Sequence, residues 1–209
     1  MDGWRGTGVV LACVVNLLAG CATQAPFHPI ADPSAPVQGN GFSIRPPVGG
    51  HWLLSESSNG SVIAFGKNDP ALFRQGGSVI AVATRERARQ GDISTPERLR
   101  SEVDAFVRRN SEGYRDVTVA LRPYRDAALG SDCVRIESNS EEHGNRHHPG
   151  QVLLLNIAGK ACRVPSAPDY FVQVTYSSRR PAGVAPILDE AVRRECEVLV
   201  DSLAFSQAR

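Results

Sequence analysis

The chain has 209 residues, the length of one domain with short appendages. Apolar residues make up 42% of it and charged residues 22%, a globular composition that excludes wholesale disorder or a coiled coil. The formal net charge of +1 gives no sign of a nucleic-acid partner.

The first twenty residues have the features of a signal peptide. A short head containing Arg5 precedes an apolar run over residues 8–18, which is broken only by Asn16. A membrane-spanning helix needs about 20 apolar residues, so this run is too short to span a bilayer and suits the core of an export signal. We therefore expect residues 1–20 to be removed and the mature protein to be extracytoplasmic.

The motif Leu18-Ala19-Gly20-Cys21 directly follows the apolar run. Small residues before a cysteine at this place resemble the lipobox of bacterial lipoproteins. The resemblance implies that the thiol of Cys21 is diacylated and anchors the protein to a bacterial membrane without a spanning helix. Ala22 stands where inner-membrane lipoproteins of many Gram-negative bacteria carry Asp, which favours the outer membrane. An ordinary secretory signal cleaved nearby is the alternative.

Residues 21–40 are predicted to be the lipidated cysteine and a tether. The segment has no hydrophobic period and carries four prolines, at positions 26, 29, 33 and 36. Such a stretch favours extended polyproline-like geometry at about 3.1 Å per residue, so its reach is roughly 60 Å at most. We expect it to hold the domain off the membrane, with His28 as a solvated linker residue.

A single α+β domain is predicted over residues 41–209. Eight runs of alternating or β-branched residues, bounded by turn residues, are predicted strands: 42–46, 52–54, 61–65, 78–84, 114–122, 131–138, 151–157 and 170–176. Thr95-Pro96-Glu97 predicts the start of an amphipathic helix that ends near 110–113, and a final helix is predicted over 186–203. Strand runs punctuated by two helices indicate a largely antiparallel sheet flanked by helices.

The order of these elements suggests a family. Phe42, Ile44, Pro47 and Trp52 open the domain, and a segment that ends Asp201-Ser-Leu-Ala-Phe205 closes it. This pattern resembles the PsbP/Mog1-like superfamily, an α/β/α sandwich that includes bacterial lipoproteins of the LpqN type. The resemblance would cover residues 41–207. It implies an accessory or binding protein, and it carries over no catalytic residue and no cofactor.

Three cysteines remain after the signal and the lipid anchor, and an oxidising compartment allows two of them to pair. If strands 131–138 and 151–157 form a hairpin, residues whose numbers add to about 292 face each other. Cys133 and Cys162 are then nearly opposed, which favours this disulfide, with Cys162–Cys196 as the next choice. Cys196 falls on the apolar stripe of the last helix, where an inert buried thiol is expected.

Carboxylates and imidazoles gather in one short segment, at Glu141, Glu142, His143, His147 and His148. These groups bind divalent transition metals, and a turn could bring three of them to one ion. Gly144-Asn145 indicates a loop rather than a helix, so an exposed polar hairpin tip is the simpler interpretation.

Arg85, Arg87 and Arg89 alternate along a predicted strand and could meet an anionic ligand, although a solvated strand edge is the commoner explanation. No nucleophile motif such as G-x-S-x-G stands out in the sequence. The sequence therefore favours a membrane-anchored envelope lipoprotein that binds another envelope protein or a cell-wall component. An extracytoplasmic enzyme or a metal-binding protein using the 141–148 loop is the alternative.

Overall fold

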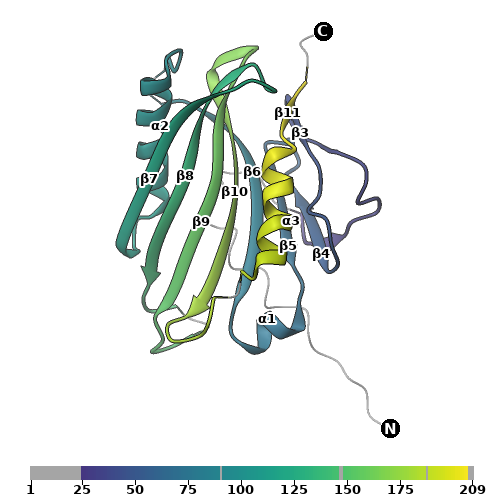
Figure 1. Ribbon diagram of the computed structural model, residues 1–209, viewed down its shortest axis with the longest axis vertical. Helices are drawn as coiled ribbons and strands as arrows, with labels where there is room; N and C mark the ends of the chain where they lie inside the picture. The colour runs from purple at the N-terminus through teal and green to yellow at the C-terminus, as the bar shows by residue number, and fades with distance from the viewer. Residues whose placement is uncertain (1–24, 90, 146–147, 187, 207–209) are drawn as a thin grey trace.

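A computed structural model of the chain describes residues 25–89, 91–145, 148–186 and 188–206. The predicted signal peptide and Cys21 lie outside these residues. The main feature is an eight-stranded antiparallel sheet (Figure 1). From one edge to the other its strands are β1 (His28–Pro29), β4 (Trp52–Glu56), β5 (Val62–Lys67), β6 (Ser78–Arg87), β10 (Ala167–Pro181), β9 (Leu153–Val164), β8 (Ser131–Glu142) and β7 (Arg115–Asp126).

The large sheet consists of two meanders joined side by side. Strands β4, β5 and β6 form the first, strands β7 to β10 form the second, and β6 pairs antiparallel with β10 to join them. A smaller sheet has the strand order β11 (Ala204–Phe205), β3 (Phe42–Ile44) and β2 (Val37–Gln38). The end of the chain therefore returns to pair with the beginning of the domain.

The prediction of an α+β fold arranged as an α/β/α sandwich is wrong, because the structure is dominated by antiparallel strands. Of the residues that the structure describes, strands hold 46% and helices 18%. Helix α2 (Pro96–Asn110) has its main sheet contacts with β7 and β8, and α3 (Glu190–Asp201) has its own with β9 and β10. Each helix thus covers part of one sheet face and no complete helical layer forms.

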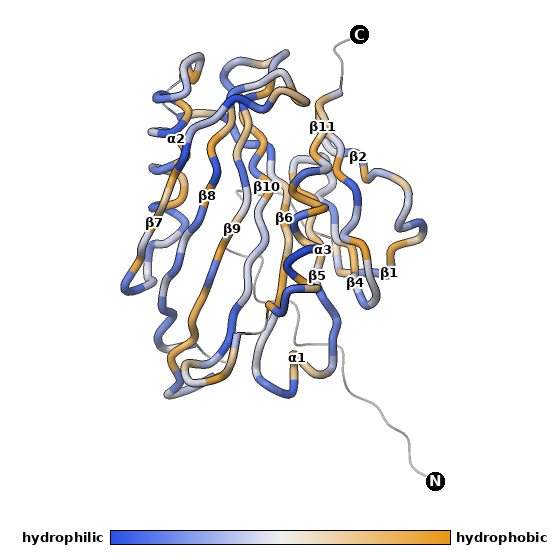
Figure 2. The backbone as a smooth tube through the Cα atoms, viewed as in Figure 1, coloured by the Kyte–Doolittle hydropathy of each residue, from blue (hydrophilic) through white to orange (hydrophobic). Residues whose placement is uncertain are grey.

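The strands of the second meander are longer than their sequence pattern indicates. Strands β7, β8 and β9 have 12 residues each and β10 has 15. The added residues of β8 (139–142) and those at the end of β10 (177–181) are mostly polar, whereas those of β9 (158–164) are mostly small or apolar. Polar and apolar residues alternate along β7 and β8 (Figure 2). These ends pair through backbone hydrogen bonds, so the apolar periodicity of the sequence does not show where the strands end.

The helices begin where their capping residues lie. Thr95 accepts a hydrogen bond from the Arg98 backbone N–H, and Pro96 follows it, so α2 begins where predicted. The last helix begins later than predicted, because Asp189 caps it by accepting from the Val192 N–H. A five-residue helix, α1 (Pro70–Arg74), capped by Asp69, was not predicted.

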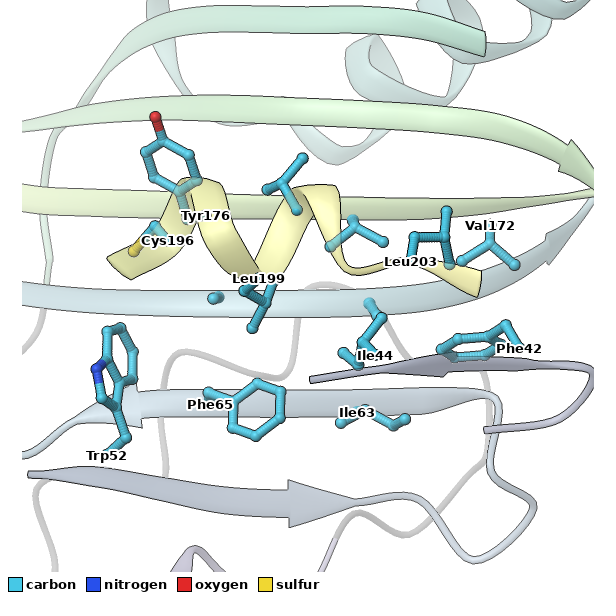
Figure 3. Close-up of a cluster of buried hydrophobic side chains, with 14 of the residues drawn as sticks. Phe42, Ile44, Trp52, Ile63, Phe65, Val172, Tyr176, Cys196, Leu199 and Leu203 are labelled. Carbon is cyan, nitrogen blue, oxygen red and sulfur yellow. The ribbon is translucent and has the colours of Figure 1, made fainter. Parts of the chain in front are cut away.

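Apolar side chains pack on both faces of the large sheet. On one face α3 and β3 cover a cluster that includes Phe42, Ile44, Trp52 and Phe65, all buried (Figure 3). On the other face α2 packs over a second cluster, where Phe106 meets Phe171 edge to face with ring centroids 5.9 Å apart. Trp52 and Phe171 are buried, and Tyr170 is partly buried against the first cluster.

The segment predicted as a tether is packed against the domain from its first described residue. The Ala25 N–H donates to the Glu56 carbonyl oxygen at 3.2 Å, and the Ser55 hydroxyl donates to the Ala25 carbonyl oxygen at 2.5 Å. Strand β1 then pairs with β4, and the side chain of Ile30 packs against the core. Proline blocks a central strand but not an edge strand, so this segment can extend the sheet by one short strand.

Candidate functional site

A polar groove of about 670 Å³ lies between α3 and the sheet face formed by β8, β9 and β10. In Figure 1 α3 runs beside β10, in front of β5 and β6, and leaves β7 and β8 uncovered. The groove is lined by residues of all four elements and of the segment before α3: Arg135, Ile136, Glu137, Ser138, Asn139, Asn156, Ile157, Ala158, Gly159, Tyr176, Ser178, Arg180, Pro186, Leu188, Arg193, Glu197, Val200 and Asp201.

Three hydrogen-bonding side chains form a row across the floor of the groove. Asn139 on β8 lies directly opposite Asn156 on β9, which in turn lies opposite Ser178 on β10. The Asn156 amide donates to the Ser178 hydroxyl at 3.5 Å. Because each amide both donates and accepts, this row offers paired donors and acceptors to a ligand lying across the strands.

The next row of the floor has a small residue in the middle and a larger side chain on each side. Ala158 on β9 lies between Glu137 on β8 and Tyr176 on β10. A Cβ atom at the adjacent Gly159 would collide with the Val174 carbonyl oxygen, so this glycine permits a close approach of β9 and β10. The small side chain of Ala158, between Glu137 and Tyr176, leaves room above the strand for a ligand.

Tyr176 forms the side of the groove toward the core. In Figure 3 its ring lies beside Cys196, with the hydroxyl directed away from Trp52 and Phe65. Burial raises the pKa of the Tyr176 hydroxyl, and the nearby carboxylate of Glu197 raises it further. The hydroxyl therefore stays protonated at neutral pH and can donate a hydrogen bond.

The charges around the groove balance. Arg135, Arg180 and Arg193 contribute three positive charges, and Glu137, Glu197 and Asp201 contribute three negative ones. They come from two strands and from one face of α3. Five of the six residues are exposed, and Arg180 is partly buried. A lining of this kind suits a polar ligand that is neutral or zwitterionic, because it offers no excess of one sign.

The cysteines lie as the hairpin argument expects. Cys133 and Cys162 are directly opposite each other on β8 and β9 and form a disulfide, with Cα atoms 4.1 Å apart. Both are buried in the first core cluster. Cys196 is a free, buried thiol on α3.

The 141–148 loop is only partly brought together. The Glu141 carboxylate and the His143 ring are in contact, with Oε2 and Nε2 2.9 Å apart. Glu142 instead pairs with Arg179 at 3.2 Å and accepts from the Asn145 amide, so its carboxylate is engaged elsewhere. His148 is described and His147 lies outside the described residues; among those described, no group of three potential metal ligands occurs.

The three alternating arginines do not form one free row. Arg85 donates to the backbone and side chain of Asn40, and its guanidinium lies over the Tyr170 ring at 4.4 Å. Arg87 pairs with Asp169 at 3.2 Å. Arg89 is exposed and follows the end of β6. Two of the three guanidinium groups thus hold neighbouring segments in place.

The groove residues were missed because their arrangement depends on pairing between distant strands. The one local signal is the alternation Arg135, Glu137, Asn139, which places three polar side chains on one face of a strand whose other face is buried. Asn156 and Ser178 join this face only through the register of β9 and β10.

Within the described residues no helix is both long and apolar enough to cross a membrane. A scan against protein-family models finds no match to the chain, and a search of the curated proteins finds none either. The function must therefore be inferred from the geometry of the groove and from the pattern of the sequence.

Proposed function

We propose that this chain is a membrane-anchored bacterial envelope lipoprotein that acts as an accessory binding protein, with the α3 groove as its binding site. The observation that carries the binding role is the groove itself, about 670 Å³ in volume and lined by polar groups of balanced charge on paired strands. Side chains on paired strands hold their positions better than side chains on loops, so the donors and acceptors are preorganised for a ligand.

The lipid anchor rests on the lipobox-like motif that ends at Cys21. The Cys133–Cys162 disulfide supports an extracytoplasmic location, since disulfides persist in oxidising compartments. The ligand we propose is a polar envelope component, either a segment of an envelope protein or a cell-wall polymer. Both present the neutral, hydrogen-bonding surface that the row from Asn139 to Ser178 can meet.

Replacement of the lipidated cysteine tests the anchor. The Cys21→Ala variant should leave the membrane fraction and appear in the soluble extracytoplasmic fraction, whereas wild type should remain bound until detergent is added. Retention of the variant in the membrane fraction would show that the anchor lies elsewhere.

A pair of neighbouring positions on α3 tests the groove. A photo-crosslinking amino acid at Glu197, which lines the groove, should form a covalent adduct with an envelope component in intact cells. The same amino acid at Val198, which is 44% exposed and is not part of the groove lining, serves as the matched control. Equal adducts from both positions, or none from Glu197, would remove the groove as the binding site.

A further inference from the structure

Residues 25–29 are fixed to the edge of the large sheet, which limits how far a lipidated protein could lie from a membrane. Ala25 exchanges hydrogen bonds with Ser55 and Glu56, and His28 and Pro29 pair with Leu54 and Leu53. The chain is therefore held against β4 from Ala25 onward. Only the segment from Cys21 to Ala25 can act as a linker between a lipid and the domain.

That linker is short. Four residues of fully extended chain reach about 14 Å, whereas a free tether over residues 21–40 would reach roughly 60 Å. A lipid on Cys21 would place the bilayer surface within about 14 Å of Ala25. The domain would then rest close to the membrane instead of standing off from it.

The strand order shows which side of the domain is near the lipid. β1 is one edge strand of the eight-stranded sheet and β7 is the other, so seven strand spacings, roughly 34 Å, separate them along the sheet. A linker of about 14 Å keeps the β1 edge within that distance of the bilayer surface, whereas it allows the β7 edge to lie roughly 34 Å farther away.

The two edges also differ in charge. Residues 25–29 and the neighbouring 57–60 turn contain no Asp, Glu, Lys or Arg. Strand β7 carries five such residues in twelve, at Arg115, Asp116, Arg122, Arg125 and Asp126. Approach to the lipid surface removes water from a side chain, which costs least where no charge is present.

We infer that the β1–β4 edge, formed by residues 25–29 and the 57–60 turn, faces the bilayer surface, and that the β7 edge points away from it. This inference rests on the lipid anchor proposed above. Strand β9, in the floor of the groove, lies five strand spacings, about 24 Å, from β1. The groove would thus open toward the envelope space, where a partner fixed in another layer can reach it.

Fluorescent labels at the two edges test this orientation. The lipidated full-length protein, carrying Ser58→Cys in the 57–60 turn or Thr118→Cys on β7, is labelled and bound to phosphatidylcholine–phosphatidylglycerol vesicles that contain a headgroup-nitroxide lipid. Both positions are exposed, while the native thiol Cys196 is buried and the other two cysteines are bonded. We expect the Ser58 label to be quenched at least twofold more strongly than the Thr118 label.

A variant with a longer linker provides the control. Twelve Gly/Ser residues inserted between Gln24 and Ala25 add a mean reach of about 20 Å, and they should lower quenching of the Ser58 label to the Thr118 level without releasing the protein. Vesicle-bound protein with equal quenching at both positions, or no effect of the insertion, would overturn the orientation alone. Protein that does not float with the vesicles would overturn the anchor and the orientation together.

Discussion

Lys67 on β5 and Glu195 on α3 form a buried ion pair that joins the last helix to the sheet. The Lys67 Nζ atom lies 2.5 Å from Glu195 Oε2, and the side chains are 6% and 17% exposed. The Trp52 indole N–H donates to the same oxygen at 2.8 Å, and its ring lies 5.0 Å from Nζ. One carboxylate thus fixes α3 against two strands, and through α3 it fixes one wall of the groove.

Removing this carboxylate should be costly, because it leaves a buried ammonium group without its partner. Glu195→Ala should lower the free energy of unfolding by about 3 to 5 kcal/mol, measured by urea denaturation. Glu190→Ala on the same helix is the matched control. Its pairing with Arg194 is solvent-exposed, so the expected loss is below about 0.5 kcal/mol. Equal losses in the two variants would contradict a special contribution from Lys67 and Glu195.

The disulfide should contribute through the unfolded state, since it closes a loop between residues 29 apart in sequence. In the chain-entropy model such a loop corresponds to about 3 to 4 kcal/mol of stability. Wild type should lose this amount when unfolding is measured in a strong reductant. The Cys133→Ala/Cys162→Ala variant should be insensitive to the reductant, because its remaining described cysteine is unpaired. A similar response of both proteins would show that reduction acts elsewhere.

Local signals predicted those parts of the fold that local chemistry decides. The cap at Thr95 with Pro96 fixes the start of α2, and the hairpin register places Cys133 opposite Cys162. The start of α3 was placed too early because Pro186 and Leu188 continue the apolar stripe. Only the Asp189 cap shows that the helix begins after them.

Pairing between distant strands decides the rest, and apolar periodicity does not reveal it. The ends of β7 to β10 extend the sheet through backbone hydrogen bonds, so the strand content was underestimated and the sandwich architecture was wrongly predicted. The groove requires Asn139, Asn156 and Ser178 to align across three strands, which depends on the register of each pair.

The buried thiol of Cys196 should make stability fall at alkaline pH. Burial, followed by the charge of Glu195, raises its pKa from 9.0 to about 12. Between these values the unfolded thiol ionises and the folded thiol keeps its proton. The unfolded state then binds fewer protons, so the free energy of unfolding decreases with pH, by at most about 1.4 kcal/mol per pH unit.

A thiol-free variant isolates this effect from other groups that titrate in the same range. Between pH 8 and 10.5 wild type should lose on the order of 1 to 2 kcal/mol more stability than Cys196→Ala, measured by urea denaturation at each pH. Parallel curves for the two proteins would mean that the folded and unfolded thiols ionise alike.

Gly159 links the fold to the groove, because it lines the groove and packs directly against the backbone of β10. A methyl group at this position would meet the Val174 carbonyl oxygen and the Thr175 backbone, neither of which can move without disturbing the β9–β10 pairing. Gly159→Ala should therefore lower the free energy of unfolding by about 1 to 3 kcal/mol. Gly50→Ala, where an added Cβ meets no atom within 4 Å, should change it by less than about 0.5 kcal/mol. If the groove is the binding site, the photo-crosslink from position 197 should weaken in Gly159→Ala and persist in Gly50→Ala, whereas an unchanged crosslink in a destabilised Gly159→Ala protein would separate the strand packing from binding.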